Sequence, residues 1–131
     1  AKSAQLTTHP QASAVFGWLD LHRQVRVRGT VSRLPASVSD EYFASRPRES
    51  QLGAWASPQS QPILGREELL ERLAEVEQRF AGVDVQRPPH WGGWLLTPHE
   101  IEFWQGRNNR LHDRFRYNLA REGWQITRLA P

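Results

Sequence analysis

A run of sixteen residues, E-F-W-Q-G-R-N-N-R-L-H-D-R-F-R-Y at positions 102–117, carries the side chains best suited to chemistry. If the second half of this run is extended, alternate side chains share one face, which then carries Arg110, His112, Arg114 and Arg116. Guanidinium groups bind phosphate oxygens two at a time, and an imidazole can donate, accept or carry a proton. A strand here therefore predicts a composite anion site. A helix would align Arg110 with Arg114 and turn His112 elsewhere.

Strand patterns dominate both ends of the chain. Residues 13–19 and 23–34 predict two adjacent antiparallel strands, because Val25, Val27 and Val31 alternate with polar side chains across a short connection. The later strand candidates are Trp94–Thr97, Ile101–Trp104, His112–Tyr117 and Trp124–Leu129. Strands joined by short turns, with a few helices, indicate an antiparallel barrel or sandwich of the α+β class. At 131 residues the chain is expected to form a single domain, residues 1–131.

Two helices are predicted between these groups of strands. The clearer one spans residues 67–80, where the apolar residues recur at helical spacing and Gly82 provides a stop. A shorter helix is expected to start at Ser39 or Asp40 as N-cap and to continue through Phe43 to Ser45. Pro47 then ends that helix or starts the next turn.

Composition narrows the class of function. The net charge is +3, but 14 acidic residues are interspersed with 17 basic ones, which disfavours a nucleic-acid surface. No apolar run approaches the roughly 20 residues that span a bilayer, and the lack of cysteine fits a cytoplasmic location. The five histidines lack the tight spacing of a metal site, and no glycine-rich phosphate loop is present. We therefore expect the chemistry to depend on a bound cofactor rather than a metal.

Five stretches occur in an order that resembles the C-terminal part of the pyridoxine/pyridoxamine 5′-phosphate oxidase family: RQVRVRG, DEYFASRPRESQLGAWASPQSQ, RPPHWGGW, EFWQGRNNRLHDR and WQITRLAP. The resemblance covers nearly the whole chain. It implies an FMN-binding split β-barrel and a homodimer with FMN at the interface. The implied reaction oxidises pyridoxamine or pyridoxine 5′-phosphate to pyridoxal 5′-phosphate, with oxygen as acceptor and release of hydrogen peroxide. The family pattern has further upstream strands. Because the sequence starts at Ala1 and contains no Met, we expect an upstream part.

The resemblance also implies roles for individual residues. Lys2 matches a lysine that contacts the FMN phosphate, and Ala1 stands where the family has its arginine partner. The other implied flavin contacts are Gln24, Gln59, Ser60, Trp104 and Arg114. The implied contacts to the substrate phosphate are Tyr42, Arg46 and Ser50, which would share a helix face if the helix continued past Pro47. Arg110 and His112 match the catalytic positions over the substrate's pyridine ring.

Two other functions fit the same residues. One is a non-catalytic split-barrel module that binds flavin or pyridoxal phosphate without turnover. The other is a related flavin oxidase for a different ring-shaped metabolite, against which the phosphate-binding set Tyr42, Arg46 and Ser50 argues. Taken alone, each aromatic side chain would be a packing residue and each arginine a solvated or ion-paired one. Their joint order and spacing favour the oxidase interpretation.

Overall fold

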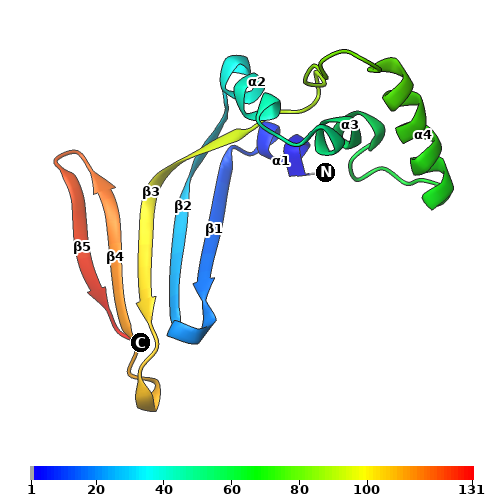
Figure 1. Cartoon of the computed structure of the whole chain (residues 1–131). Helices are drawn as coiled ribbons and strands as arrows, with labels where there is room; N and C mark the ends of the chain where they lie inside the picture. Colours follow the sequence, from blue (N-terminus) through cyan, green and yellow to red (C-terminus); the bar gives the residue numbers. More distant parts are fainter. Residues whose placement is uncertain (1) are drawn as a thin grey trace. The chain divides into compact units, whose positions relative to one another are not determined.

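The computed structural model describes residues 2–131, which form two compact units. The first unit combines the residues up to Ser32 with Leu95–Pro131, and the second spans Arg33–Trp94. The elements of these residues, in chain order, are α1 (Lys2–Thr8), β1 (Gln11–Trp18), η1 (Leu19–Leu21), β2 (Arg23–Arg33), α2 (Ala36–Ala44), α3 (Arg48–Ala56), α4 (Arg66–Arg79), β3 (Trp94–Gln105), η2 (Asn108–Arg110), β4 (Asp113–Ala120) and β5 (Gly123–Leu129) (Figure 1).

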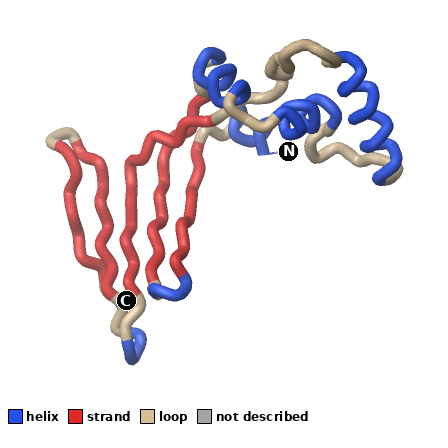
Figure 2. The backbone as a smooth tube through the Cα atoms, viewed as in Figure 1, coloured by secondary structure: helices blue, strands red, loops and turns tan. Residues whose placement is uncertain are grey.

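The five strands form one sheet in the order β1-β2-β3-β4-β5, so every strand lies beside its neighbour in sequence (Figure 2). The pairs β1–β2, β3–β4 and β4–β5 are antiparallel. This confirms the predicted pairing of the first two strands and the α+β class. The two short candidates at 94–97 and 101–104 are a single strand, β3, which contains Pro98. The register of β3 with β4 begins at Glu100, so Pro98 lies outside that ladder.

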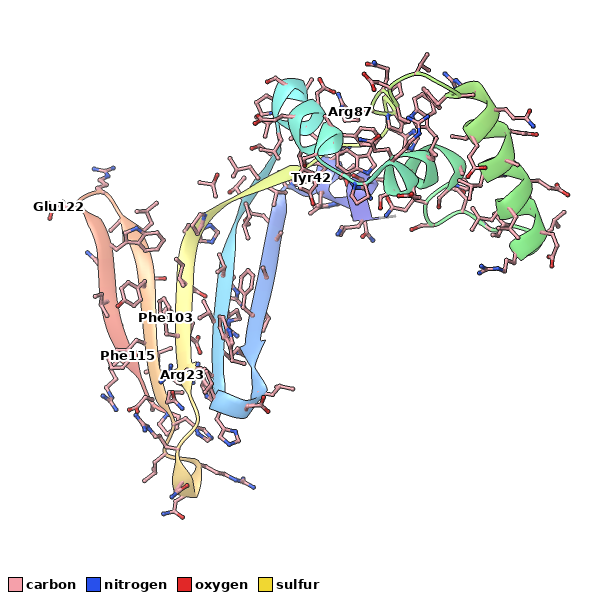
Figure 3. The ribbon with its side chains drawn as sticks, in the orientation of Figure 1. Arg23, Tyr42, Arg87, Phe103, Phe115 and Glu122 are labelled. Atoms are coloured by element: carbon pink, nitrogen blue, oxygen red, sulfur yellow. The ribbon has the colours of Figure 1, made fainter. Side chains whose placement is uncertain are left out.

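The registers give the sheet two chemically different faces. One face, called the apolar face below, carries Phe16 opposite Val25 and Phe103 opposite Phe115 (Figure 3). The other, called the polar face, carries Trp104 opposite Arg114 and Glu102 opposite Arg116. Ion pairs of Arg26 with Glu102 and of Arg28 with Glu100 assign the even-numbered positions of β2 to the polar face. The alternation predicted for residues 24–31 is therefore the division between these faces.

The second unit has its core between α2, α3 and α4. Phe43, Leu52, Phe80 and Val85 form the buried cluster. Arg48 fastens α3 to the end of α4, because its guanidinium donates to the carbonyl oxygens of Phe80 and Val83 at 2.6 and 2.9 Å. The predicted helix at 67–80 is confirmed as α4. None of the helices in residues 2–131 is long and apolar enough to span a membrane.

The short helix differs from its prediction. It starts at Ala36, with Pro35 rather than Ser39 or Asp40 at the N-cap, and Ser39 is buried inside it. Proline favours the first positions of a helix because its fixed φ suits them and its missing N–H has no intrahelical partner there. The same preference explains α3, a helix that the sequence analysis did not predict, which begins directly after Pro47.

Candidate functional site

The run 102–117 forms the end of β3, a turn and the start of β4. Arg114 and Arg116 share the polar face of β4, as the strand interpretation predicted. The placement of Arg110 on that strand face is wrong, because Arg110 ends η2 and has a left-handed backbone with φ of 61°. Asn109 before it has φ of 56°, a conformation that asparagine tolerates well. His112 lies just before the first residue of β4.

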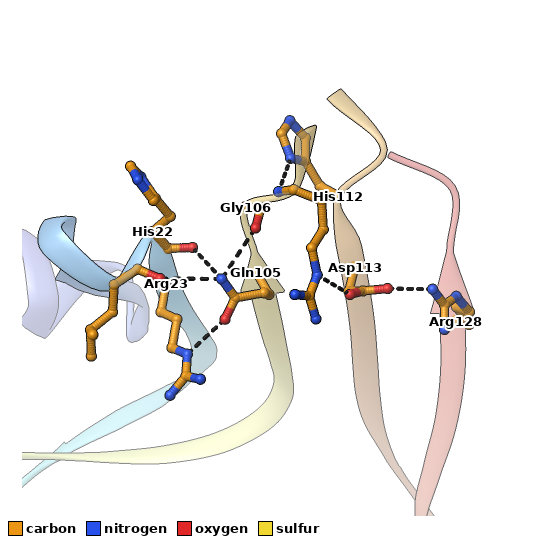
Figure 4. Close-up of polar contacts among 9 residues, drawn as sticks. His22, Arg23, Gln105, Gly106, His112, Asp113 and Arg128 are labelled. Atoms are coloured by element: carbon orange, nitrogen blue, oxygen red, sulfur yellow. Dashed lines mark hydrogen bonds and ion pairs between the residues drawn. The ribbon is translucent and has the colours of Figure 1, made fainter. Parts of the chain in front are cut away.

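His112 is held against Trp104. The two ring centroids are 4.7 Å apart with planes inclined at 47°. The backbone N–H of Arg107 donates to His112 Nδ1 at 3.1 Å (Figure 4). Because Nδ1 accepts this bond, a neutral His112 carries its proton on Nε2. The imidazole therefore has its Nε2–H available as a donor, on a ring whose orientation is set by Trp104 and the turn.

Arg114 belongs to an ion-pair network on the polar face. Its Nε donates to Glu102 Oε1 at 3.0 Å, and its Nη1 donates to the carbonyl oxygen of Ala130 at 2.9 Å. Arg26 donates to the other oxygen of Glu102, Oε2, at 2.7 Å. Glu102 is only 5% exposed. This network, made of Arg26, Glu102 and Arg114, joins β2, β3 and β4 through one buried carboxylate.

A second polar cluster lies where β3 ends and β4 begins. Gln105 accepts a bond from Arg23 Nε at 2.6 Å and donates to the carbonyl oxygens of Leu21 and His22 (Figure 4). Asp113 lies between Arg107 and Arg128 and forms an ion pair with each. The hydrogen bond from Arg107, together with the charges of Arg107 and Arg128, holds the pKa of Asp113 below its usual range, although partial desolvation opposes this. These contacts fix the turn that leads from β3 into His112.

A pocket of about 530 Å³ opens beside this cluster within the first unit. Most of its lining residues belong to the apolar face or to the polar cluster around Gln105 and Asp113. Two predicted flavin contacts, Gln24 and Trp104, also line the pocket. The lining residues are Trp18, Leu21, Arg23, Gln24, Val25, Phe103, Trp104, Gln105, Arg107, Asp113 and Phe115. Arg110, His112 and Arg114 do not line it.

The predicted phosphate contacts lie in the second unit. Tyr42 on α2 stacks on Trp91 at 6.0 Å, and the guanidinium of Arg46 lies 5.2 Å from the centroid of the same indole ring. Arg46 Nη1 is buried and has no hydrogen-bond partner among residues 2–131. The condition for one helix face shared by Tyr42, Arg46 and Ser50 is not met, because α2 ends at Ala44 and Ser50 lies in α3. Pro47 interrupts the helix, since it cannot donate the helical hydrogen bond.

The remaining predicted flavin contacts come from three places. Gln24 is half-buried on β2, opposite Gly17 of β1. Lys2 is the exposed first residue of α1. Gln59 and Ser60 are exposed in the turn that follows α3, where Ser60 has φ of 64°. Within the first unit, the structure thus brings Gln24, Trp104 and Arg114 onto the polar face.

Two residues of these clusters escaped the sequence analysis. Glu102 was visible as a charged residue between Ile101 and Phe103 in an alternating strand, a pattern that calls for a partner across the sheet. Trp91 lies in the stretch RPPHWGGW, and no local pattern there reveals that it contacts both Tyr42 and Arg46. No cluster of three or more His, Asp or Glu residues suited to a metal ion occurs in the part of the chain that the structure describes.

Two family models match the chain. The model described as pyridoxamine 5′-phosphate oxidase matches residues 1–80. The model described as the pyridoxine 5′-phosphate oxidase C-terminal dimerisation region matches residues 91–131.

Curated relatives are similar over the full chain. A protein of Synechocystis sp. named pyridoxine/pyridoxamine 5′-phosphate oxidase is 55% identical over 100% of this chain and 61% of its own length. One of the same name from Rubrobacter xylanophilus is 55% identical over 99% of this chain and 60% of its own length. The chain thus spans about three fifths of the length of the relatives it matches.

Solved structures support the same assignment. PhzG from Burkholderia lata, solved in complex with tetrahydrophenazine-1-carboxylic acid, has a TM-score of 0.90 and 34% identity, covering 99% of this chain and 63% of PhzG. An FMN-binding protein from Nostoc punctiforme, related to pyridoxamine 5′-phosphate oxidase, shares the fold alone, with a TM-score of 0.74 and 15% identity over 100% of this chain and 68% of that one. These similarities confirm the expected split-barrel α+β fold, and the chain belongs to the pyridoxamine 5′-phosphate oxidase family.

Proposed function

We propose that this chain forms part of an FMN-dependent oxidase that converts pyridoxamine or pyridoxine 5′-phosphate to pyridoxal 5′-phosphate. In the alcohol reaction the substrate's CH2OH group loses a hydride from its carbon and a proton from its hydroxyl, and oxygen takes up these two electrons and two protons as hydrogen peroxide. The observation that carries the proposal is the convergence of Trp104, His112 and Arg114 where β3 turns into β4. The names of the curated relatives agree with this reaction.

The polar face fits a flavin by its donor set. It combines a flat indole at Trp104, a carboxamide at Gln24 and the guanidinium of Arg114, which together suit a planar ring edged with polar atoms. Buried Nε donors of Arg26 and Arg116, which lack partners among residues 2–131, add positive charge on the same face. Lys2, Gln59 and Ser60 would contribute further contacts. When bound, FMN supplies the two-electron redox chemistry, and these residues hold and orient it.

The substrate's phosphate is assigned to the second unit. Arg46 offers a buried guanidinium nitrogen without a partner among residues 2–131, and a buried donor of this kind favours an anionic ligand. The hydroxyls of Tyr42 and Ser50 would add directed hydrogen bonds. In the first unit, the Nε2–H of His112 would donate to a polar group on the pyridine ring, and Arg110 would orient that ring.

Turnover tests the proposal directly. The purified protein, with FMN and oxygen, is expected to release hydrogen peroxide when pyridoxine 5′-phosphate is added and to form pyridoxal 5′-phosphate in equal amount. Pyridoxine without phosphate serves as the matched control and should react far more slowly. Binding of FMN and pyridoxal phosphate without peroxide would instead support a non-catalytic binding module.

One finding supports a second candidate function, the oxidation of a ring-shaped acid without a phosphate. The solved PhzG structure holds a ring-shaped carboxylic acid that carries no phosphate. A flavin oxidase acting on such an acid would retain the Trp104 and Arg114 contacts but would not need the phosphate set around Arg46. Peroxide release with a ring acid, and none with pyridoxine 5′-phosphate, would favour this candidate.

A further inference from the structure

Glu102 is an unusual residue for the centre of a sheet. It is 5% exposed, and its two oxygens bind guanidinium groups from the strands on either side. A buried carboxylate is costly unless it is paired and hydrogen-bonded. Arg26 from β2 and Arg114 from β4 provide that pairing at 2.7 and 3.0 Å.

The contacts of Arg114 leave its side chain little freedom. Its Nε and Nη2 both point at Glu102 Oε1, at 3.0 Å each, while Nη1 reaches the carbonyl oxygen of Ala130. Three of its nitrogens are thus directed by fixed acceptors, so one rotamer is selected for the guanidinium plane. The network of Arg26, Glu102 and Arg114 has a net positive charge, because two guanidinium groups surround one carboxylate.

We infer that Glu102 is a positioning residue for the flavin site, which holds Arg114 in the orientation that contacts FMN. This inference rests on the proposed function, since it takes Arg114 as a flavin contact. Glu102 itself acts through Arg114 rather than on the flavin. If the carboxylate is removed, Arg114 is free to rotate. Binding FMN must then order the Arg114 side chain, and the entropy cost of this ordering weakens the binding.

The chain provides a matched control. Glu100 lies two residues earlier on the same face of β3 and pairs with Arg28 at a longer distance of 3.6 Å. The side chains of Arg28 and Glu100 are 53% and 16% exposed, so solvent screens this pair. Glu100→Gln removes the same charge from the same strand without touching Arg114.

The first measurement needs no flavin. In the full chain, hydrogen exchange of the Arg114 Nε–H, followed by NMR, should be at least about tenfold faster in Glu102→Gln than in the wild type or in Glu100→Gln. Glu102→Asp keeps the charge but shortens the side chain, and it should give an intermediate rate if Glu102→Gln folds poorly. Equal exchange in the wild type and both Glu102 variants would overturn the inference.

The second measurement is FMN affinity, read from quenching of tryptophan emission. Glu102→Gln should weaken FMN binding about tenfold in the wild-type background and leave it unchanged in the Arg114→Ala background. An equal loss in both backgrounds would mean a general structural role and would overturn the inference. Failure of the wild-type protein to bind FMN, with slow Arg114 exchange intact, would overturn the proposed function while leaving the positioning of Arg114 established.

Discussion

Arg46 combines a buried guanidinium nitrogen that lacks a partner among residues 2–131 with support from two aromatic rings. Cation–π contact with Trp91 and Phe43 fixes the group without using its hydrogen-bond donors. We predict that Arg46→Ala raises the KM for pyridoxine 5′-phosphate roughly 10- to 100-fold, the loss expected for charge-assisted hydrogen bonds. The Kd of the variant for FMN should stay within about twofold of the wild-type value, because no flavin contact is assigned to Arg46. Steady-state kinetics and FMN titration measure the two effects.

Arg66→Ala is the control for that variant. Arg66 is an exposed arginine at the start of α4, in the same unit as Arg46, and it forms no ion pair within residues 2–131. Removing it deletes the same charge without altering a predicted ligand contact. Similar losses of affinity for FMN and for the phosphorylated substrate in Arg46→Ala would contradict the division of the two binding sites.

Because of the ion pairs of Asp113, we expect the stability of the protein to depend on pH. Arg107 and Arg128 lower its pKa in the folded state from the ordinary value of 3.8, so the unfolded state binds the proton more readily. The stabilisation from Asp113 is therefore present above about pH 3.8 and is lost as the pH falls through the lower folded pKa. Asp113→Asn should be less stable than the wild type in urea at pH 7, and the gap should shrink in strong acid.

Glu122→Gln provides the comparison for Asp113→Asn. Glu122 is an exposed carboxylate in the turn between β4 and β5, and it has no ion pair in the described part of the chain (Figure 3). Its replacement should leave stability unchanged to within measurement error at both pH values. A gap for Asp113→Asn that persists unchanged in strong acid would exclude the ion pairs as its cause.

At the scale of elements, β2 and β3 approach too closely at one point for any side chain. A Cβ built on Gly29 would lie 2.1 Å from the carbonyl oxygen of Thr97 and 2.9 Å from Pro98 Cα. We predict that Gly29→Ala destabilises the fold by at least about 1–3 kcal/mol, because backbone atoms must move to admit the methyl group. Gly17→Ala on β1 should be almost neutral, since nothing lies within 4 Å of its Cβ position. Urea denaturation of both variants measures the contrast, and equal stabilities would refute the close approach.

Some elements of the fold were predictable from the sequence, and others were not. The alternation of Val25 and Val27 with Arg26 and Arg28 is local, so it predicted β2 and its two faces correctly. The helix α3 was missed because Pro47 was interpreted as ending a helix or starting a turn, although proline also begins helices. Arg110 was placed wrongly because the left-handed turn at Asn109 breaks the strand pattern before His112. The pattern around Glu102 calls for a partner across the sheet, but the sequence does not identify Arg26 as that partner, since the two residues are 76 positions apart.

At the scale of the whole molecule, the exposed side chains indicate association. Phe16, Leu119 and Ile126 in the strands are each more than half exposed, a costly arrangement for large apolar groups facing water. The family model for residues 91–131 describes a dimerisation region, and it covers all of β3, β4 and β5. We therefore expect the protein to form a homodimer, with a monomer–dimer equilibrium that analytical ultracentrifugation can follow.

Flavin binding and dimerisation should then be linked. If FMN is held between two protomers, it binds the dimer far more tightly than the monomer, and each process must strengthen the other by the same factor. Saturating FMN is thus expected to lower the dimer dissociation constant at least about tenfold in sedimentation equilibrium. Pyridoxine without phosphate, which has no assigned contact at the FMN site, is the ligand control and should leave the constant unchanged. Because linkage is reciprocal, diluting the protein below its dimer dissociation constant should also weaken the measured FMN affinity. An FMN affinity that is independent of protein concentration would show that one protomer holds the flavin alone.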